Sequence, residues 1–134
     1  MSPHVSPIIL NGGFVFVVNT PADTVDVIDR SYQAPHTRIH VGIDPVSIAT
    51  RPDEMETWVA NHISDSVSVI DTNPVSPTFL QVIDTVQDFD PDTKATRFSG
   101  PAGIAFANNR KASGAFAAEN HISVVAVATP TIIK

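Results

Sequence analysis

The chain contains an internal repeat, and this repeat limits what the chain can fold into more than any other feature. Residues 16–29, FVVNTPADTVDVID, align without a gap to residues 58–71, WVANHISDSVSVID, so that Asn61 follows Asn19 by 42 residues. Seven of the fourteen aligned positions are identical. A repeat of roughly 40–45 residues has the length of one four-stranded β unit. The sequence therefore predicts a series of such units along the chain.

A third, more divergent copy of the repeat follows the first two. The segment 101–106, PAGIAF, matches 45–50, PVSIAT, and two later segments take the places of strands in the second copy. This alignment needs a deletion of about three residues, and Ala126 stands where the first two copies have Asp29 and Asp71. We expect a third unit that is recognisable but degraded.

Each copy has the pattern of short β-strands. Apolar segments of five or six residues, rich in Val, Ile and Phe, are separated by Pro, Gly, Asn and Asp. The 11 prolines leave little room for a long helix. The predicted strands of an all-β fold are 5–10, 14–19, 24–29 and 37–41 in the first copy, 45–50, 56–61, 66–71 and 79–86 in the second, and 101–106, 114–118, 121–127 and 130–133 in the third.

The first two copies resemble the YVTN β-propeller repeat, a WD-like repeat of surface-layer-like and YncE-like proteins in bacteria and archaea. The resemblance rests on VFVVNTPADTVDVID, on TWVANHISDSVSVID and on GIDPVSIA at 42–49. The tetrads FVVN at 16–19 and WVAN at 58–61 keep the aromatic residue and the Asn of the motif, but not its Thr. The resemblance covers about residues 5 to 127 and implies a β-propeller of four-stranded antiparallel blades.

Three blades are fewer than a closed propeller contains, because such rings typically close with 4–8 blades. An incomplete ring would leave two apolar blade faces uncovered. We therefore expect a fragment of a longer propeller chain, completed by its remaining blades or by a second copy of itself. The expected partial propeller spans 1–134, with blade 1 at about 5–41, blade 2 at about 45–86, an inter-blade loop at 87–100 and a degraded blade 3 at about 101–133.

Composition excludes several classes of partner. The chain has 14 Asp and Glu against 8 Lys and Arg, a net charge of -6, which argues against binding to nucleic acid phosphates. No apolar run reaches the roughly 18 residues of a membrane span, so we expect no membrane insertion.

The start of the chain does not have the pattern of a signal peptide. There is no cysteine, which rules out disulfides and thiolate chemistry within this sequence.

The resemblance also implies where a ligand would bind. In propellers, one face gathers the loops between blades and the loops between the two middle strands of each blade, and that face usually carries the site. Thr20 and the long loop 87–100 would lie on this face. The candidate ligand-binding residues there are Asn19, Asp44, Asn61, His62, Glu119, Asn120 and His121.

The motif Asn-His-Ile-Ser occurs twice, at 61–64 and 120–123, and suggests a metal site as one alternative. His62 and His121, joined by an acidic residue, could bind a metal. In the other interpretation both are polar loop residues that were copied with the repeat. The alignment gap leaves the two imidazoles out of register and no spacing fixes a third ligand, so we expect no metal site.

The acidic run at 88–92, with Asp at every second position, is similar to the start of a calcium-binding loop. Thr93 stands at the position where that loop needs Gly, and Ser99 stands where it needs Glu. We expect a solvated acidic loop, and the sequence leaves cation binding open.

No common catalytic motif of hydrolases, nucleotide-binding enzymes or zinc peptidases occurs in the sequence. We expect a non-catalytic binding or scaffold module for a small molecule or a protein, without a cofactor. Many YVTN-repeat proteins are exported or surface-associated, which implies a periplasmic or surface location for the full-length protein. One alternative is a fragment of a propeller enzyme, lactonase-like or associated with a quinone- or haem-dependent dehydrogenase. Another is a decayed gene product without a function of its own.

Overall fold

The computed structural model describes residues 7–31, 36–87, 101–108, 111–116, 121–126 and 131–132. Its strands form three separate four-stranded sheets, and in each sheet the strands follow one another in chain order as an antiparallel meander. The first sheet contains β1 (Ile8–Asn11), β2 (Phe14–Asn19), β3 (Thr24–Asp29) and β4 (Thr37–His40). The second contains β5 (Pro45–Thr50), β6 (Glu56–Asn61), β7 (Ser66–Asp71) and β8 (Val82–Val86). The third contains β9 (Pro101–Asn108), β10 (Lys111–Phe116), β11 (His121–Ala126) and β12 (Thr131–Ile132).

The prediction of an all-β fold is confirmed, and the strands of the ungapped repeat have the predicted bounds. A short 3-10 helix, η1 (Thr20–Ala22), lies in the turn after β2. The start of the strand predicted at 79–86 was wrong, because β8 begins only at Val82. Residues 72–80 instead form turns that are held by the Asp71 carboxylate, and Leu80 adopts a φ of 64° that no strand allows. The predicted strand 114–118 begins earlier, at Lys111, because β9 continues to Asn108 and pairs with it there.

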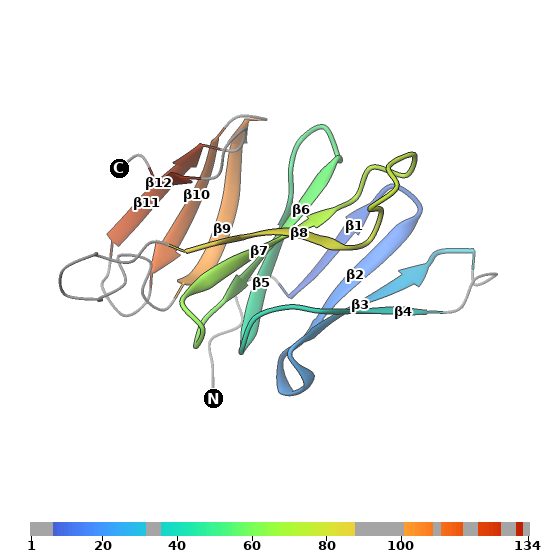
Figure 1. The fold of residues 1–134 in the computed structure, drawn as a ribbon, viewed down its shortest axis with the longest axis horizontal. Coiled ribbons are helices and arrows are strands. Elements are labelled where there is room, and N and C mark those ends of the chain that lie inside the picture. The colour runs from blue at the N-terminus through green and yellow to red at the C-terminus, as the bar shows by residue number, and fades with distance from the viewer. Residues whose placement is uncertain are drawn as a thin grey trace.

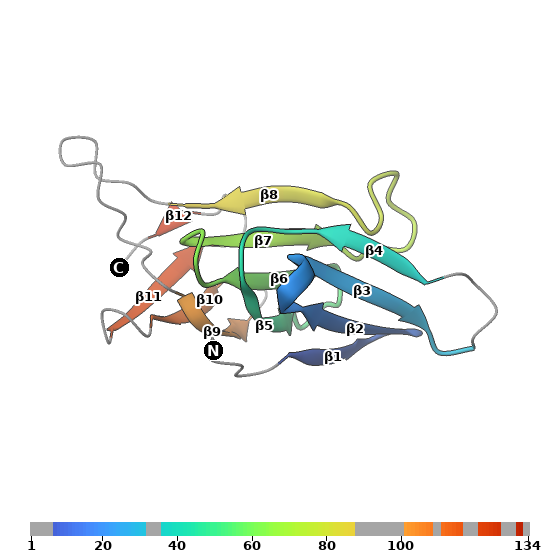
Figure 2. The same cartoon turned by 90° about the horizontal axis from the view of Figure 1, so that it is seen from below.

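The three sheets lie side by side in chain order (Figure 1). The first strand of the second sheet, β5, contacts β1 and β2, and the first strand of the third sheet, β9, contacts β5 and β6. Figure 2 shows β1, β5 and β9 along one side of the molecule and the last strands, β4, β8 and β12, along the other. Each sheet therefore turns a face toward its neighbour, and the strands that begin the sheets lie together.

Apolar side chains fill the space between the first and second sheets. The cluster combines residues of β2, β3 and β4 with residues of β5, β6 and β7. Alternation along a strand sends every second side chain to the same face, which selects these positions. The buried members are Phe16, Val18, Val25, Val27 and Ile39 from the first sheet and Ile48, Val59 and Ile70 from the second.

A second cluster lies between the second and third sheets and is centred on Trp58. The Trp58 side chain is fully buried, and its ring meets the ring of Phe106 edge-on, with centroids 5.3 Å apart and planes at 78°. Val67 and Val69 of β7 pack beside it. Because Trp58 and Val59 point to opposite faces of β6 and both are buried, the second sheet is covered on both sides.

Candidate functional site

Two ends of the sheets come into consideration as functional sites. The first, here called the loop end, is the one predicted from the sequence, and it gathers the turns 19–24, 41–45 and 61–66. The structure brings these turns together through several hydrogen bonds, of which three are central to the site. Asp44 N–H donates to Asp23 Oδ1 at 2.9 Å, His62 N–H donates to the Asp44 carbonyl at 2.9 Å, and Thr20 Oγ1 donates to the Pro45 carbonyl at 2.7 Å.

The candidate residue Asn61 makes internal contacts at the loop end. Its side chain is fully buried, and Nδ2 donates to Ser66 Oγ at 3.1 Å and to Ser68 Oγ at 2.9 Å. It also lies against Gly42, where an added Cβ would come within 2.6 Å of Asn61 Nδ2. These contacts give Asn61 a structural role in joining the turn before β5 to the hairpin of β6 and β7.

Asp44 and His62 have fixed backbones, and His62 is the more exposed of the two. Asp44 has a φ of 62° and is only 8% exposed. His62 is half-buried, and its Nδ1 is buried without a hydrogen-bond partner among the described residues. Asn19 ends β2, is half-buried, and makes no side-chain cap to η1. The structure therefore brings Asn19, Asp44 and His62 to one end of the first two sheets.

The third copy contributes little to the described part of the loop end. Glu119, Asn120 and the acidic segment 88–92 lie outside the described residues. The backbone of His121 begins β11 and pairs with Phe116, but its side chain lies outside the described part as well. Within the described ranges, no three His, Asp or Glu side chains come together in the manner of a metal site. The sequence-based expectation that His62 and His121 do not share a metal therefore stays a prediction.

Unpartnered polar atoms also gather near the loop end. In the part of the chain that the structure describes, four buried side-chain atoms have no hydrogen-bond partner. Each belongs to a residue that lies at most two positions from a strand end at the loop end. Buried polar atoms are otherwise almost always hydrogen-bonded, so such atoms mark places where water or a ligand binds. They are Thr24 Oγ1, Ser47 Oγ, Asn61 Oδ1 and His62 Nδ1.

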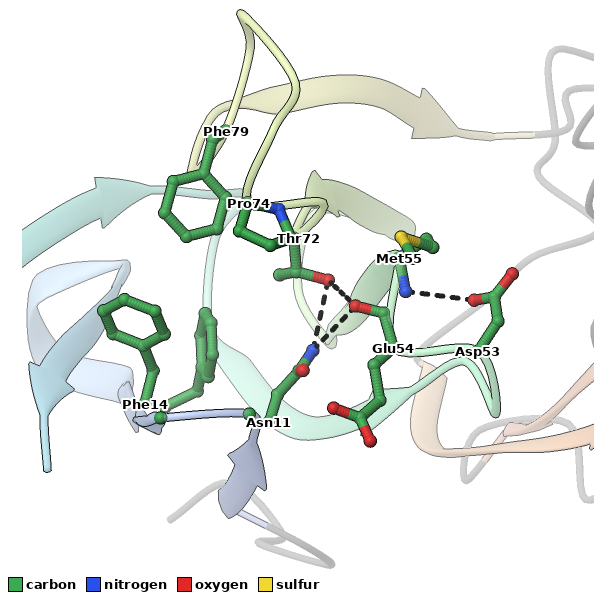
Figure 3. A pocket seen from close by; sticks show the side chains of 11 residues that line it. Asn11, Phe14, Asp53, Glu54, Met55, Thr72, Pro74 and Phe79 are labelled. Carbon is green, nitrogen blue, oxygen red and sulfur yellow. Dashed lines mark hydrogen bonds between the residues drawn. The ribbon is translucent and has the colours of Figure 1, made fainter.

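The second site is a cavity of about 330 Å³ at the opposite end, which the sequence did not predict. Three turns surround it, 11–14 between β1 and β2, 51–55 between β5 and β6, and 72–79 after β7 (Figure 3). The sequence signal that could have indicated this cavity is the pair Gly12–Gly13 next to the aromatic Phe14. Its lining consists of Asn11, Gly12, Gly13, Phe14, Phe16, Asp53, Glu54, Met55, Thr72, Pro74 and Phe79.

A buried amide forms the polar wall of the cavity. Asn11 is 6% exposed, and its Nδ2 lies 3.1 Å from both Thr57 Oγ1 and Thr72 Oγ1 and 3.3 Å from the Glu54 carbonyl oxygen. Thr72 Oγ1 donates to the same carbonyl oxygen at 2.9 Å (Figure 3). One strand end of the first sheet is thus tied to two turns of the second, and the backbone around Glu54 is fixed.

The apolar wall is aromatic, and a hydrogen-bonded loop holds part of it. The rings of Phe14 and Phe79 are 5.7 Å apart at 59°, a tilted arrangement typical of aromatic pairs. Ser76 and Thr78 donate their hydroxyls to the Asp71 carboxylate, which shapes the loop that carries Phe79. Burial acts to raise the pKa of Asp71, but hydrogen bonds from Ser76, Thr78 and the backbone N–H of Asn73 outweigh it and hold the pKa below its ordinary value of 3.8.

The two carboxylates that line the cavity have different partners. Asp53 is paired with Arg51 at 2.8 Å and accepts the Met55 N–H at 3.0 Å. Burial raises the pKa of Asp53, yet the bonds from Arg51 and Met55 bring it below 3.8 overall. Glu54 is exposed, and its Oε2 lies 3.9 Å from the place where a Cβ on Gly12 would sit. Among the residues that the structure describes, no Lys, Arg or His lines the cavity.

Comparison with known proteins gives matches at the level of structure only. The sequence matches no protein-family model and no curated protein. The structure is similar to the β-propeller domain of Cps50 (Swd1) from Myceliophteria thermophila, with a TM-score of 0.69 and 14% identity over 99% of this chain and 39% of that chain. The fold is that of a β-propeller.

Two other solved structures have a similar fold. Hydrazine synthase of Kuenenia stuttgartiensis matches with a TM-score of 0.72 and 24% identity, over 98% of this chain and 33% of that chain. Apo AztD from Citrobacter koseri matches with a TM-score of 0.71 and 16% identity, over 95% of this chain and 33% of that chain. The chain therefore spans about a third of these larger structures and forms a partial propeller. Among the described residues, no helix is long and apolar enough to cross a membrane.

Proposed function

We propose that the chain is a non-catalytic binding module that supplies three blades to a larger propeller. One observation carries the proposal: the outward face of the first sheet is uncovered at positions that are buried in the second. Val17 and Ile28 are the repeat equivalents of Val59 and Ile70. Val59 and Ile70 are fully buried against the first sheet, whereas Val17 and Ile28 are half-buried.

The uncovered face extends to the first strand. Ile8 pairs with Val17 and Leu10 with Val15, so these side chains share one face of the sheet. Ile8 is 59% exposed and Leu10 62% exposed. Full burial of each would contribute about 1.5–3 kcal/mol, which favours a further blade on this face. We refer to Ile8, Leu10, Val15, Val17 and Ile28 as the open face.

The chemistry of a fitting partner follows from the repeat. The second sheet meets the first across apolar side chains, and the residues that face it from the first sheet include Phe16, Val25 and Val27. A blade that presents an aromatic residue and two valines in the same places would cover the open face in the same way. Such a blade would come from a longer parent chain or from a second copy of this chain.

The loop end supports the binding part of the proposal. His62 Nδ1 and Asn61 Oδ1 are buried there without partners in the described part of the chain, which suits a polar ligand or bound water. The Asp23 carboxylate accepts a backbone N–H across the same end, which favours a structural role for it. The resemblance to YVTN repeats supports an exported or surface-located parent protein.

An enzyme fragment, lactonase-like or part of a dehydrogenase, is the second candidate function. Half-buried His62 at the loop end is the observation that favours it, because imidazole is the side chain that most often serves as a general base. Turnover of an aliphatic lactone that is abolished by His62→Gln, in a chain that stays folded, would favour this candidate over a binding module.

Solution mass tests the open face directly. We expect the 134-residue chain to self-associate in a concentration-dependent manner in analytical ultracentrifugation. The double variant Ile8→Lys with Leu10→Lys is expected to shift the chain toward monomer, whereas Val75→Lys, at a loop residue that is 89% exposed, is expected to leave the association unchanged. A wild-type chain that is a stable, soluble monomer at all concentrations would contradict the proposal.

A further inference from the structure

The described walls of the cavity all come from the first two sheets. All eleven of its described lining residues belong to these sheets and their turns. Its volume of about 330 Å³ lies at the lower end of the roughly 300–1,000 Å³ that ligand pockets enclose. The cavity is therefore large enough for a small organic molecule. The residues of its walls indicate the chemical class of that molecule.

The walls combine aromatic rings with negative charge. Phe14 and Phe79 supply tilted rings, and Pro74 and the Met55 thioether extend the apolar surface. Ring faces carry negative electrostatic potential and attract organic cations. Because the described lining contains carboxylates and no basic residue, the cavity favours a positively charged guest over an anionic one.

The backbone of Glu54, which carries one of these charges, is held in place beside the cavity. Its φ of 64° is strained for a residue with a side chain, and three hydrogen bonds to its backbone N–H and carbonyl hold it there. The Glu54 N–H donates to the Arg51 carbonyl at 2.7 Å, and its carbonyl accepts from Asn11 and Thr72. Figure 3 shows the Glu54 side chain on the Asn11 side of the cavity.

Glu54 is also the carboxylate at this site that remains available to a guest. The Asp53 carboxylate is already engaged by Arg51, whose guanidinium also lies 3.2 Å from Glu56 Oε1. No ion pair or hydrogen bond of the Glu54 carboxylate occurs among the described residues. A cationic group of a ligand would therefore meet an unneutralised charge at the edge of an apolar space.

We propose that this cavity binds a small organic ammonium compound with an apolar or aromatic body. The body lies against Phe14, Phe79 and Pro74, and the ammonium group contacts the Glu54 carboxylate. The inference goes beyond the proposed assembly of blades, because it requires only the first two sheets.

The experiment compares three probes that share a phenyl body and differ in charge. The 134-residue chain is titrated with 2-phenylethylammonium, 2-phenylethanol and 3-phenylpropionate at pH 7, and binding is followed by amide chemical shifts. We expect the ammonium to bind roughly threefold to tenfold more tightly than the alcohol, and the carboxylate to bind most weakly. The largest shifts are expected at residues 11–14, 53–55 and 72–79.

Substitutions separate the charge from the apolar wall. Glu54→Gln is expected to bring the ammonium to the affinity of the alcohol while leaving the alcohol unaffected. Asp84→Asn, which removes an exposed carboxylate from β8, serves as the matched control and is expected to change neither affinity. Phe79→Leu is expected to weaken both probes.

Three results would overturn the proposal. They are equal affinities of the wild-type chain for the ammonium and the alcohol, an unchanged preference in Glu54→Gln, and shifts that map away from the cavity. Self-association of the chain is measured separately, so the outcome for the cavity does not depend on the outcome for the open face.

Discussion

Asn61 lies directly against Gly42, so close that a Cβ on Gly42 would be 2.6 Å from its Nδ2 and 2.5 Å from Ser64 Oγ. The Asn that recurs in the repeat is thus held in a space that only glycine leaves open. The contact connects the turn before β5 to the hairpin of β6 and β7, two segments of the loop end. It explains why an amide that looks like a ligand-binding residue in the sequence is fully buried.

The first prediction concerns this contact. Gly42→Ala is expected to lower the free energy of unfolding by about 1–3 kcal/mol, because the buried Asn61 amide cannot move aside without losing its bonds to Ser66 and Ser68. Urea denaturation measures the change. Gly13→Ala is the matched control, since nothing lies within 4 Å of its Cβ position. Equal stability of the two variants would show that the contact between Gly42 and Asn61 does not contribute to the free energy of unfolding.

The second prediction concerns the amide that ties the first two sheets together at the cavity. Asn11→Ala is expected to destabilise the chain by about 1–3 kcal/mol, because Thr57 Oγ1 and the Glu54 carbonyl lose a buried donor. Asn73→Ala, which removes only an exposed side-chain bond to the Val75 N–H, is expected to have a smaller effect. Thermal denaturation compares the two variants, and the reverse order would contradict the role of Asn11.

The third prediction uses the chain's single tryptophan to follow the third sheet. Trp58 is fully buried and meets Phe106 of β9 edge-on. Phe106→Ala is expected to raise the quenching of Trp58 fluorescence by acrylamide, because it opens the contact between the second and third sheets. Phe79→Leu, at the cavity, is expected to leave quenching unchanged. Unaltered quenching in Phe106→Ala would contradict the packing of β9 against β6.

The fourth prediction concerns the pH dependence of stability. The pKa of Asp71 is held below 3.8 in the folded chain, so its carboxylate contributes stability that is present above the unfolded pKa and is lost as the pH falls through the folded pKa. Asp71→Asn is expected to be less stable than the wild type by about 1–3 kcal/mol at pH 7. The difference should shrink below pH 3.8.

Urea denaturation at a series of pH values measures this effect. Asp84→Asn, at an exposed strand position, is the control and is expected to change stability little at any pH. A difference between Asp71→Asn and the wild type that stays constant from pH 7 to pH 3 would contradict the assignment of the hydrogen bonds from Ser76 and Thr78 to an ionised carboxylate.

Local patterns were enough to predict the strands of the repeat. The strands predicted at 14–19, 24–29, 45–50, 56–61 and 66–71 have the bounds of β2, β3, β5, β6 and β7. Alternating apolar residues and the recurring Asp23 and Asp65 define these hairpins, and both aspartates adopt a positive φ, 56° and 50°, at the turn before the next strand. Short-range chemistry fixes such features.

The start of β8 and the loop before it depended on a contact that the pattern did not show. The Asp71 side chain accepts the N–H of Asn73 in the turn that follows β7, at 3.0 Å. It also accepts the hydroxyls of Ser76 and Thr78, which lengthens the loop and delays the strand to Val82. Side-chain bonds of this kind compete with strand pairing and leave no periodic trace in the sequence.

The 42-residue repeat by itself determined the fold class, the order of strands within each sheet and the incomplete number of blades, because each follows from residues close together in the chain. Only the tertiary structure decided where the cavity lies and which polar groups remain available. The cavity forms where residues 11–14, 51–55 and 72–79 meet. The open face is recognised only by comparison with the second sheet, in which the equivalent side chains are buried. Both depend on packing between segments far apart in the sequence, which no local pattern encodes.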